Sequence, residues 1–137
     1  GQAPLGLRPW VVSLDEVESF CRKAQAGQDR LFVEGAGGVM SPLGSDFLNI
    51  DLMVRLKAKA ILVCGGYLGT ISHTLTALAA LKARDVPVAA IVLSGAGTLP
   101  VPLEETRQSL QRFQSVPVYG VDAGGDVPAA LVDALLP

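Results

Sequence analysis

The sequence predicts an α/β protein with a parallel sheet of about four strands and flanking helices. Two observations lead to this fold class. Short apolar runs, most of them rich in Val or Ile, stand at intervals along the chain, as in strands that are buried on both faces. Segments with helical periodicity separate these runs, and an alternation of strands with helices is typical of right-handed crossovers between parallel strands.

The expected strands determine where a site would lie. The runs occupy residues 31–33, 60–64, 88–93 and 116–119. In an open parallel sheet the carboxyl ends of the strands share one edge, and ligands bind at that edge. Glycine-rich turns follow all four runs, so we expect any binding site to be built from the segments 35–38, 65–69, 95–97 and 120–125.

The first helix has the clearest sequence signals. Ser13 and Glu16 have the spacing of a capping box, Gly27 is placed to end the helix, and Cys21 falls on its apolar face. Further helices are expected at about 49–57, at about 70–84, from about Pro102, and after Asp126 as N-cap. No linker or internal repeat divides the 137 residues, so residues 1–137 are expected to form a single domain.

Composition argues against several classes of protein. The net charge is only -2 and the 11 Lys and Arg residues are scattered, so no basic stripe is present for binding nucleic acid. No signal peptide is recognisable and no run of ~18 uncharged apolar residues occurs, which predicts a cytoplasmic protein without a membrane span. Cys21 and Cys64 have neither metal-ligand spacing nor the density of a disulfide scaffold, and are expected to be reduced core residues.

The strongest local feature is the run Val33–Gly38, with the sequence V-E-G-A-G-G. A carboxylate here leaves an apolar run and enters a loop that has almost no side chains. Glycines let the backbone approach a ligand closely and present N–H groups to an anion. Beside phosphates, a carboxylate is most useful as a ligand of Mg²⁺, which prefers oxygen. Glu34 is therefore the candidate metal ligand; the alternative is that it ends a strand and the glycines form a turn.

A second feature is C-G-G-Y-L-G-T-I-S-H-T, which combines a strand, a glycine turn and a helix start. The N-terminus of a helix suits a carboxylate or a phosphate. His73 is the only histidine and has no partner at metal-ligand spacing, so we interpret it as structural or as a minor polar lining. Ser41 and Ser72 lie outside any G-x-S-x-G elbow, which argues against an acyl-transfer nucleophile. The P-loop motif G-x-x-x-x-G-K-[ST] does not occur in the 137 residues, so this chain alone has no Walker A cradle.

Taken together, three blocks resemble dethiobiotin synthase. They are V-E-G-A-G-G-V-M-S-P-L, A-I-L-V-C-G-G-Y-L-G-T-I-S-H-T-L-T-A-L-A-A-L and P-V-A-A-I-V-L-S-G. Their order, spacing and residues agree with the family over about residues 12–136, most closely in the first two blocks. The resemblance implies a partial P-loop NTPase-like three-layer fold that corresponds to the C-terminal two-thirds of the family. The first strand, the P-loop and the helix after it are not among these residues.

The resemblance implies an ATP- and Mg²⁺-dependent ligase of biotin biosynthesis that closes a ring. Carbon dioxide adds to one amine of 7,8-diaminopelargonate, the carbamate takes the γ-phosphoryl group of ATP, and the second amine displaces phosphate to give dethiobiotin. In the family, the loop at the helix start of the second block reaches a site shared with a partner subunit. A cytoplasmic homodimer with small-molecule substrates is therefore implied.

The resemblance also assigns site residues. Glu34 would bind Mg²⁺, and Glu34, Gly37 and Gly38 would be catalytic. Residues implied to contact the nucleotide are Glu34, Gly35, Ala36, Gly37, Ser94, Gly95, Ala123, Gly124 and Gly125. Residues implied to contact the substrate are Gly38, Ser41, Leu68, Gly69, Thr70, Ile71 and Ser72. The sequence departs from the family at the adenine end, where Ser94 replaces the usual Asn and cannot supply the paired donor and acceptor of an amide.

Three hypotheses stay open at this point. The first is a dethiobiotin synthase whose P-loop portion lies outside this chain. The second is a non-catalytic homologue that keeps the fold and the pocket as a binding or regulatory domain. The third is a related amide ligase of cobalamin biosynthesis, which shares the architecture, although the I-S-H-T helix start favours the first family.

Overall fold

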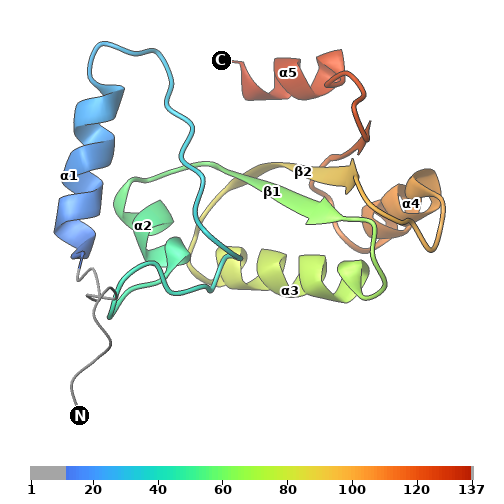
Figure 1. The fold of residues 1–137 in the computed structure, drawn as a ribbon, viewed down its shortest axis with the longest axis horizontal. Helices are drawn as coiled ribbons and strands as arrows, with labels where there is room; N and C mark the ends of the chain where they lie inside the picture. Colours follow the sequence, from blue (N-terminus) through green and yellow to red (C-terminus); the bar gives the residue numbers. More distant parts are fainter. Residues whose placement is uncertain (1–11, 137) are drawn as a thin grey trace, which may run out of the picture. The chain divides into compact units, whose positions relative to one another are not determined.

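The computed structural model describes residues 12–136, and the chain divides after Leu56 into two compact units (Figure 1). The first unit contains helices α1 (Leu14–Gln25) and α2 (Asn49–Arg55). The second unit contains β1 (Ala60–Gly65), α3 (Thr70–Ala83), β2 (Val88–Gly95), α4 (Leu103–Phe113), β3 (Val118–Asp122) and α5 (Ala129–Leu135). The expectation that the whole chain forms a single domain stays a prediction.

Helix α1 begins with the capping box that the sequence predicts. Ser13 Oγ accepts a hydrogen bond from the Glu16 N–H at 3.2 Å, and the Ser13 N–H donates to Glu16 Oε2 at 2.8 Å. Both bonds satisfy N–H groups that a helix leaves free at its start. The helix ends one residue before Ala26, and Gly27 adopts a left-handed φ of 74°. These cap residues therefore set both ends of the helix.

A charge network joins α1 to α2 within the first unit. Arg55 Nη1 lies 2.6 Å from Asp15 Oδ1 and 2.8 Å from Glu18 Oε2. The hydrogen bond from Arg55 is the main reason that the pKa of Glu18 is lowered. The helices also bury apolar residues, among them Cys21 at 5% exposure and Ile50 at 0%. Burial and the ion pairs together hold α2 in place beside α1.

The expected strand at residues 31–33 is wrong. These residues are irregular and have no ladder partner in the part of the chain that the structure describes. A strand exists only where a neighbouring strand accepts and donates its backbone hydrogen bonds, which an apolar composition cannot supply. Phe32 and Val33 are accordingly 70% and 48% exposed instead of buried.

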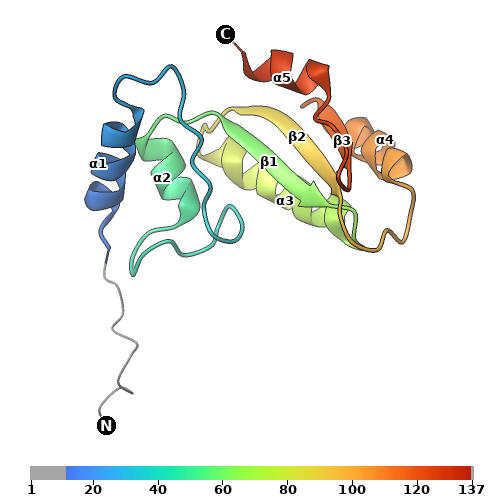
Figure 2. The same cartoon turned by 45° about the horizontal axis from the view of Figure 1, so that its top comes forward.

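The second unit confirms the α/β class and the other three strands. Its sheet has the order β1-β2-β3, and both pairs are parallel, with Leu62 beside Ile91 and Ile91 beside Val118. The described sheet thus has three strands rather than about four. Helices α3 and α5 lie on opposite sides of the strands, as Figures 1 and 2 show.

The core of the second unit lies between the sheet and helices α3 and α4. Ile91, Leu93, Leu110 and Val118 are buried there, and Ile71 and Leu78 of α3 pack against them. The periodic apolar residues of α3 thus face the sheet as expected. Helix α5 buries Leu131 at 4% exposure.

The start of α5 differs from the prediction. Asp126 was the expected N-cap, but Pro128 occupies that position and no side chain caps the helix. The residue before a proline is disfavoured in the helical region, and Pro128 itself has an extended ψ of 133°, so the chain becomes helical only after Pro128. The other helix starts agree with expectation, including Pro102 immediately before α4.

Both cysteines are free thiols, as expected. Cys21 is buried and Cys64 is half-buried, and burial raises the pKa of the Cys64 thiol above its ordinary value. None of the helices within residues 12–136 has the length and apolar character needed to cross a membrane.

Candidate functional site

The glycine loop of the first unit contains all the site residues predicted there. Glu34 is exposed at its start, and the segment Gly35–Gly38 follows without secondary structure. Gly37 has a left-handed φ of 77°, and a Cβ atom at this position would overlap Ser41 Oγ. Only glycine fits this position without displacing Ser41. The structure thus brings Glu34, the glycines and Ser41 together in one loop.

Two side chains hold the backbone of this loop. Ser41 Oγ accepts a hydrogen bond from the Gly38 N–H at 2.8 Å. Asn49 Nδ2 donates to the carbonyl oxygens of Ala36 and Gly38, each at 2.8 Å. Asn49 is 4% exposed and is the first residue of α2, so the loop is tied to a buried helix start. These bonds fix the direction of the loop's peptide groups.

Sequence reasoning missed the role of Asn49. The sequence placed this residue only at the beginning of a helix, where Asn is common and needs no further explanation. The signal that distinguishes it is burial with partners distant along the chain, because a buried amide must find hydrogen bonds. Neither burial nor such a partner is readable from residue spacing.

The residues around Glu34 fit a magnesium ion only in company with a phosphate. Among the described residues there is no group of three or more His, Cys, Asp and Glu that could hold a metal ion. Mg²⁺ is commonly held by one or two carboxylates, with substrate phosphates and water completing its octahedron. The exposed carboxylate of Glu34, next to a bare backbone, has the donor type for such a shared site.

The second unit brings the other predicted residues to one edge of its sheet. Ser94 pairs with Gly65 on one side and with Val121 on the other, and Gly95 pairs with Asp122. Because the strands are parallel, the loops that follow them leave from the same edge. The start of α3, the turn at Ser94 and the turn after β3 therefore share this edge.

The start of α3 has free N–H groups. Its N-cap is Gly69, with a φ of 90°, and no side chain caps the helix. The N–H groups of Ile71 and Ser72 therefore lack an acceptor within the helix, which suits an anionic group. Thr70 is 3% exposed, its Oγ1 donates to Gly65 O at 2.6 Å and its N–H donates to Tyr67 O at 3.2 Å, so neither of these groups is free for a ligand. Leu68, by contrast, is 81% exposed.

A pair of aromatic side chains braces the turn before this helix. Tyr67 Oη lies 2.8 Å from His73 Nδ1, and the two ring centroids are 5.6 Å apart. His73 Cε1 would lie 3.7 Å from a Cβ atom at Gly69. A structural role for His73, as interpreted from the sequence, agrees with this contact.

The turns after β2 and β3 have different internal supports. Ser94 Oγ accepts a hydrogen bond from the Ala96 N–H at 3.3 Å, so the hydroxyl caps its own turn. The Gly125 N–H donates to Asp122 O at 2.8 Å. Ala123, Gly124 and Gly125 are all exposed, and a Cβ atom at Gly124 would meet nothing within 4 Å. These residues therefore present an open backbone surface.

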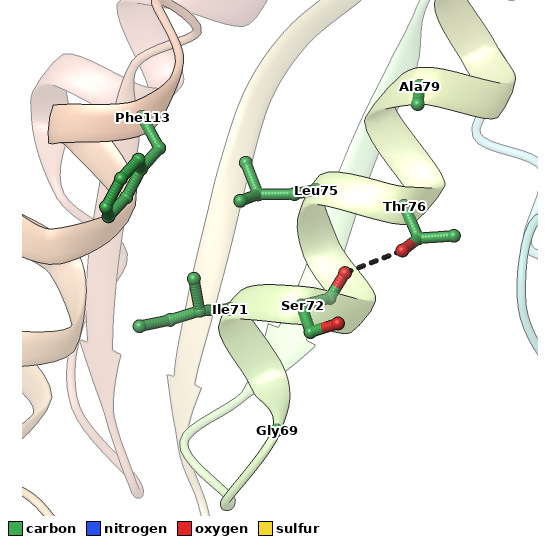
Figure 3. Close-up of a pocket in the computed structure, with 7 residues that line it drawn as sticks. All are labelled: Gly69, Ile71, Ser72, Leu75, Thr76, Ala79 and Phe113. Atoms are coloured by element: carbon green, nitrogen blue, oxygen red, sulfur yellow. Dashed lines mark hydrogen bonds between the residues drawn. The ribbon is translucent and has the colours of Figure 1, made fainter.

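An apolar groove begins at the start of α3. Its volume is about 770 Å³, and its lining comprises Gly69, Ile71, Ser72, Leu75, Thr76, Ala79 and Phe113. Figure 3 shows Ile71 and Leu75 directed from α3 toward Phe113 on α4. Phe113 is 66% exposed. The groove thus places an apolar wall next to the free N–H groups. Whether this edge and the glycine loop form one site stays a prediction.

Comparison with known proteins identifies the family. A family model described as an AAA domain (AAA_26) matches residues 10–121. A protein of Caulobacter sp. (strain K31) is 46% identical over 122 residues, which are 88% of this chain and 53% of the relative. One of Acidiphilium cryptum (strain JF-5) is 44% identical over 102 residues, 74% of this chain and 46% of the relative. One of Bacillus subtilis subsp. natto is 32% identical over 111 residues, which are 80% of this chain and 48% of the relative.

Each of these three relatives is named ATP-dependent dethiobiotin synthetase BioD. The chain spans about half the length of the curated relatives it matches. The family model covers most of the chain and includes the glycine loop, the start of α3 and the turn at Ser94. This chain therefore belongs to the AAA_26 family and resembles its dethiobiotin synthetases.

Proposed function

We propose that the chain provides the metal-binding and substrate-binding part of a cytoplasmic dethiobiotin synthase. The reaction joins carbon dioxide to 7,8-diaminopelargonate and hydrolyses ATP to ADP and phosphate. One amine forms a carbamate, a carbamate oxygen takes the γ-phosphoryl group, and the second amine attacks the carbonyl carbon as phosphate leaves. The observation that carries this proposal is an exposed carboxylate, Glu34, at the start of a glycine loop whose backbone is held by hydrogen bonds to Ser41 and Asn49.

Glu34 and the glycine loop would act on the phosphates. When bound beside Glu34, Mg²⁺ would neutralise negative charge on the phosphate groups. The bare backbone at Gly37 and Gly38 would let phosphate oxygens and the reacting carbamate approach the N–H groups, because no Cβ atom intervenes. Fixed donors of this kind stabilise charge that develops in a transition state without having to reorganise.

The start of α3 would bind the carboxylate of the substrate. The N–H groups of Ile71 and Ser72 have no acceptor in the helix, and the helix dipole adds positive potential at this end. The apolar groove that begins at the same residues would suit the aliphatic chain of such an acid. Anchoring one end of the substrate limits the positions of its amines, which is a large contribution to a ring closure.

The resemblance to dethiobiotin synthases also supports a homodimer. In these enzymes the second loop contributes to a site shared with a partner subunit, and in this chain that loop adjoins the exposed apolar groove. Phe113 at the rim of the groove is the side chain that a partner would cover. Association through this face would complete the substrate site.

The proposal is tested by a product assay. An enzyme assembled from this chain and the P-loop portion of a dethiobiotin synthase is incubated with 7,8-diaminopelargonate, bicarbonate, ATP and Mg²⁺, and dethiobiotin is measured by mass spectrometry together with released phosphate. One phosphate for each dethiobiotin is expected. Glu34→Gln should abolish this turnover and leave the circular dichroism spectrum unchanged. Full activity of that variant would remove Glu34 from the metal role.

A second candidate is a non-catalytic homologue that binds a small molecule. The observation that favours it is at Ser94, which stands in place of the family's usual Asn and whose Oγ accepts a hydrogen bond from the Ala96 N–H of its own turn. Calorimetry with 7,8-diaminopelargonate and with Mg-ATP separates the two candidates. Binding of the diamine without binding of the nucleotide would favour the non-catalytic homologue.

A further inference from the structure

Asn49 makes two hydrogen bonds that are unusual for a residue at the start of a helix. Its side-chain nitrogen has two hydrogens, and they go to Ala36 O and Gly38 O, each at 2.8 Å. Both acceptors lie more than ten residues earlier in the sequence. The amide thus holds alternate carbonyl groups of the glycine loop on its own side.

The geometry of the peptide group gives these bonds a consequence. In a trans peptide a carbonyl group and the N–H of the next residue point in opposite directions, and every described peptide here is trans. With the carbonyls of Ala36 and Gly38 turned toward Asn49, the N–H groups of Gly37 and Val39 are turned away from it. Neither N–H has a hydrogen-bond partner within residues 12–136.

Two further contacts fix the conformation of the loop. The N–H of Gly38, between the two outward N–H groups, is already bound to Ser41 Oγ at 2.8 Å. On the other side, Asn49 Oδ1 is buried without a partner among the described residues, and a Cβ atom at Gly35 would overlap it. Gly35 therefore has to be glycine if Asn49 is to keep its place.

We propose that Asn49 is the residue that positions the glycine loop for anion binding. It turns the N–H groups of Gly37 and Val39 outward, as a pair of donors for a phosphate group beside Glu34. Asn49 itself does not touch the ligand; it acts through the two carbonyls that it binds. The nature of the ligand rests on the proposed function, whereas the control of the loop by Asn49 does not.

The test uses the ¹⁵N-labelled 137-residue chain. Asn49→Ala removes both hydrogen bonds, and Asn49→Asp keeps the shape but presents a carboxylate to two carbonyl oxygens. In both variants, hydrogen exchange of the Gly38 amide should accelerate by about tenfold or more, because loss of the two bonds releases the loop. Titration with inorganic pyrophosphate and Mg²⁺ should shift the Gly37 and Val39 amide signals in the native chain, with about tenfold weaker binding in the variants.

Leu52→Ala is the matched control. Leu52 lies one turn further along α2 and is 6% exposed, so its truncation should destabilise the helix at least as much. It should nevertheless leave the Gly38 exchange relative to global unfolding, and the affinity for pyrophosphate, unchanged. If Leu52→Ala reproduced the Asn49 variants, general loss of stability would explain the result and the inference would fall.

A second route does not alter Asn49 at all. Gly35→Ala should displace the amide by steric overlap and so reproduce the loop exchange of Asn49→Ala. The double variant Gly35→Ala with Asn49→Ala should be no worse than either single variant, since both remove the same contact. Fully additive effects, or unchanged Gly38 exchange in Asn49→Ala, would overturn the positioning role. A native chain that binds no pyrophosphate, with Gly38 exchange still controlled by Asn49, would overturn the anion-binding assignment alone.

Discussion

The backbone of Gly37 provides a sharp test of how the glycine loop is built. Gly37→Ala places a methyl group in a left-handed conformation, with φ at 77°, which costs about 1–2 kcal/mol. The same methyl group would overlap Ser41 Oγ and lie 2.9 Å from Ser41 Cβ. Displacement of Ser41 also removes the hydrogen bond from Gly38, which contributes about 0.5–1.5 kcal/mol. The native loop should therefore be destabilised by about 1.5–3.5 kcal/mol.

Gly27→Ala is a control in the same unit of the chain. Gly27 has a similar φ of 74°, but a Cβ atom there meets nothing within 4 Å. It should therefore show the conformational cost of about 1–2 kcal/mol alone. Urea denaturation measures how far each substitution lowers the free energy of unfolding. Hydrogen exchange of the Gly38 amide measures the change within the loop itself. Equal effects of the two substitutions, with Gly38 still protected, would refute the contact between Gly37 and Ser41.

Three other outcomes are expected. Leu110→Ala, at a side chain with 0% exposure in the second unit, should lower the free energy of unfolding by about 2–5 kcal/mol in urea; a loss below about 1 kcal/mol would contradict its place in the core. The pKa of Glu104 is lowered from 4.5 to about 2, mainly by the hydrogen bond from Arg107 and then by Gln108. Its stabilising effect should thus be complete above about pH 4.5 and be lost as pH falls through about 2. Carboxyl NMR titration should show that Arg107→Ala raises this pKa toward 4.5, and no rise would disprove the assignment. Phe113→Glu, at the rim of the groove, should convert the proposed homodimer to monomers in sedimentation, whereas an unchanged mass would place any dimer contact elsewhere.

The sequence predicts well those features that depend on nearby residues. The Ser13 and Glu16 cap, the apolar stripe of α3 and the strands at 60–65 and 88–95 all follow from local spacing and composition. Each depends on groups within a few residues or on a repeating pattern. Their positions therefore agree with the structure to within one or two residues.

Features that depend on distant partners are not predicted. Residues 31–33 have the composition of a strand, yet a strand needs a neighbour, and the described chain offers none. Asn49 supports a loop more than ten residues away, which no local spacing reveals. At the start of α5, Asp126 has the right residue type, but Pro128 disfavours a helical conformation of the residue before it and so decides where the helix begins.

The sequence predicts different features of the candidate site in the two units. In the first unit, Glu34 is exposed and Gly37 has the left-handed backbone that glycine allows, whereas binding of a phosphate by this loop stays a prediction. In the second unit, parallel pairing brings Ser94 to the same edge as the start of α3, because the carboxyl ends of parallel strands share one edge. Ser94 Oγ, however, serves its own turn, a detail that only coordinates give.

Paramagnetic NMR is the most direct measurement of whether Glu34 and the glycine loop hold a metal-bound anion. Mn²⁺ replaces Mg²⁺ in the presence of pyrophosphate, and the amide signals of residues 34–39 are followed in the native chain and in Glu34→Gln. Broadening confined to these amides in the native chain, and absent from the variant, is the expected result. Equal broadening in both proteins, or broadening centred on other residues, would show that the ion is bound elsewhere.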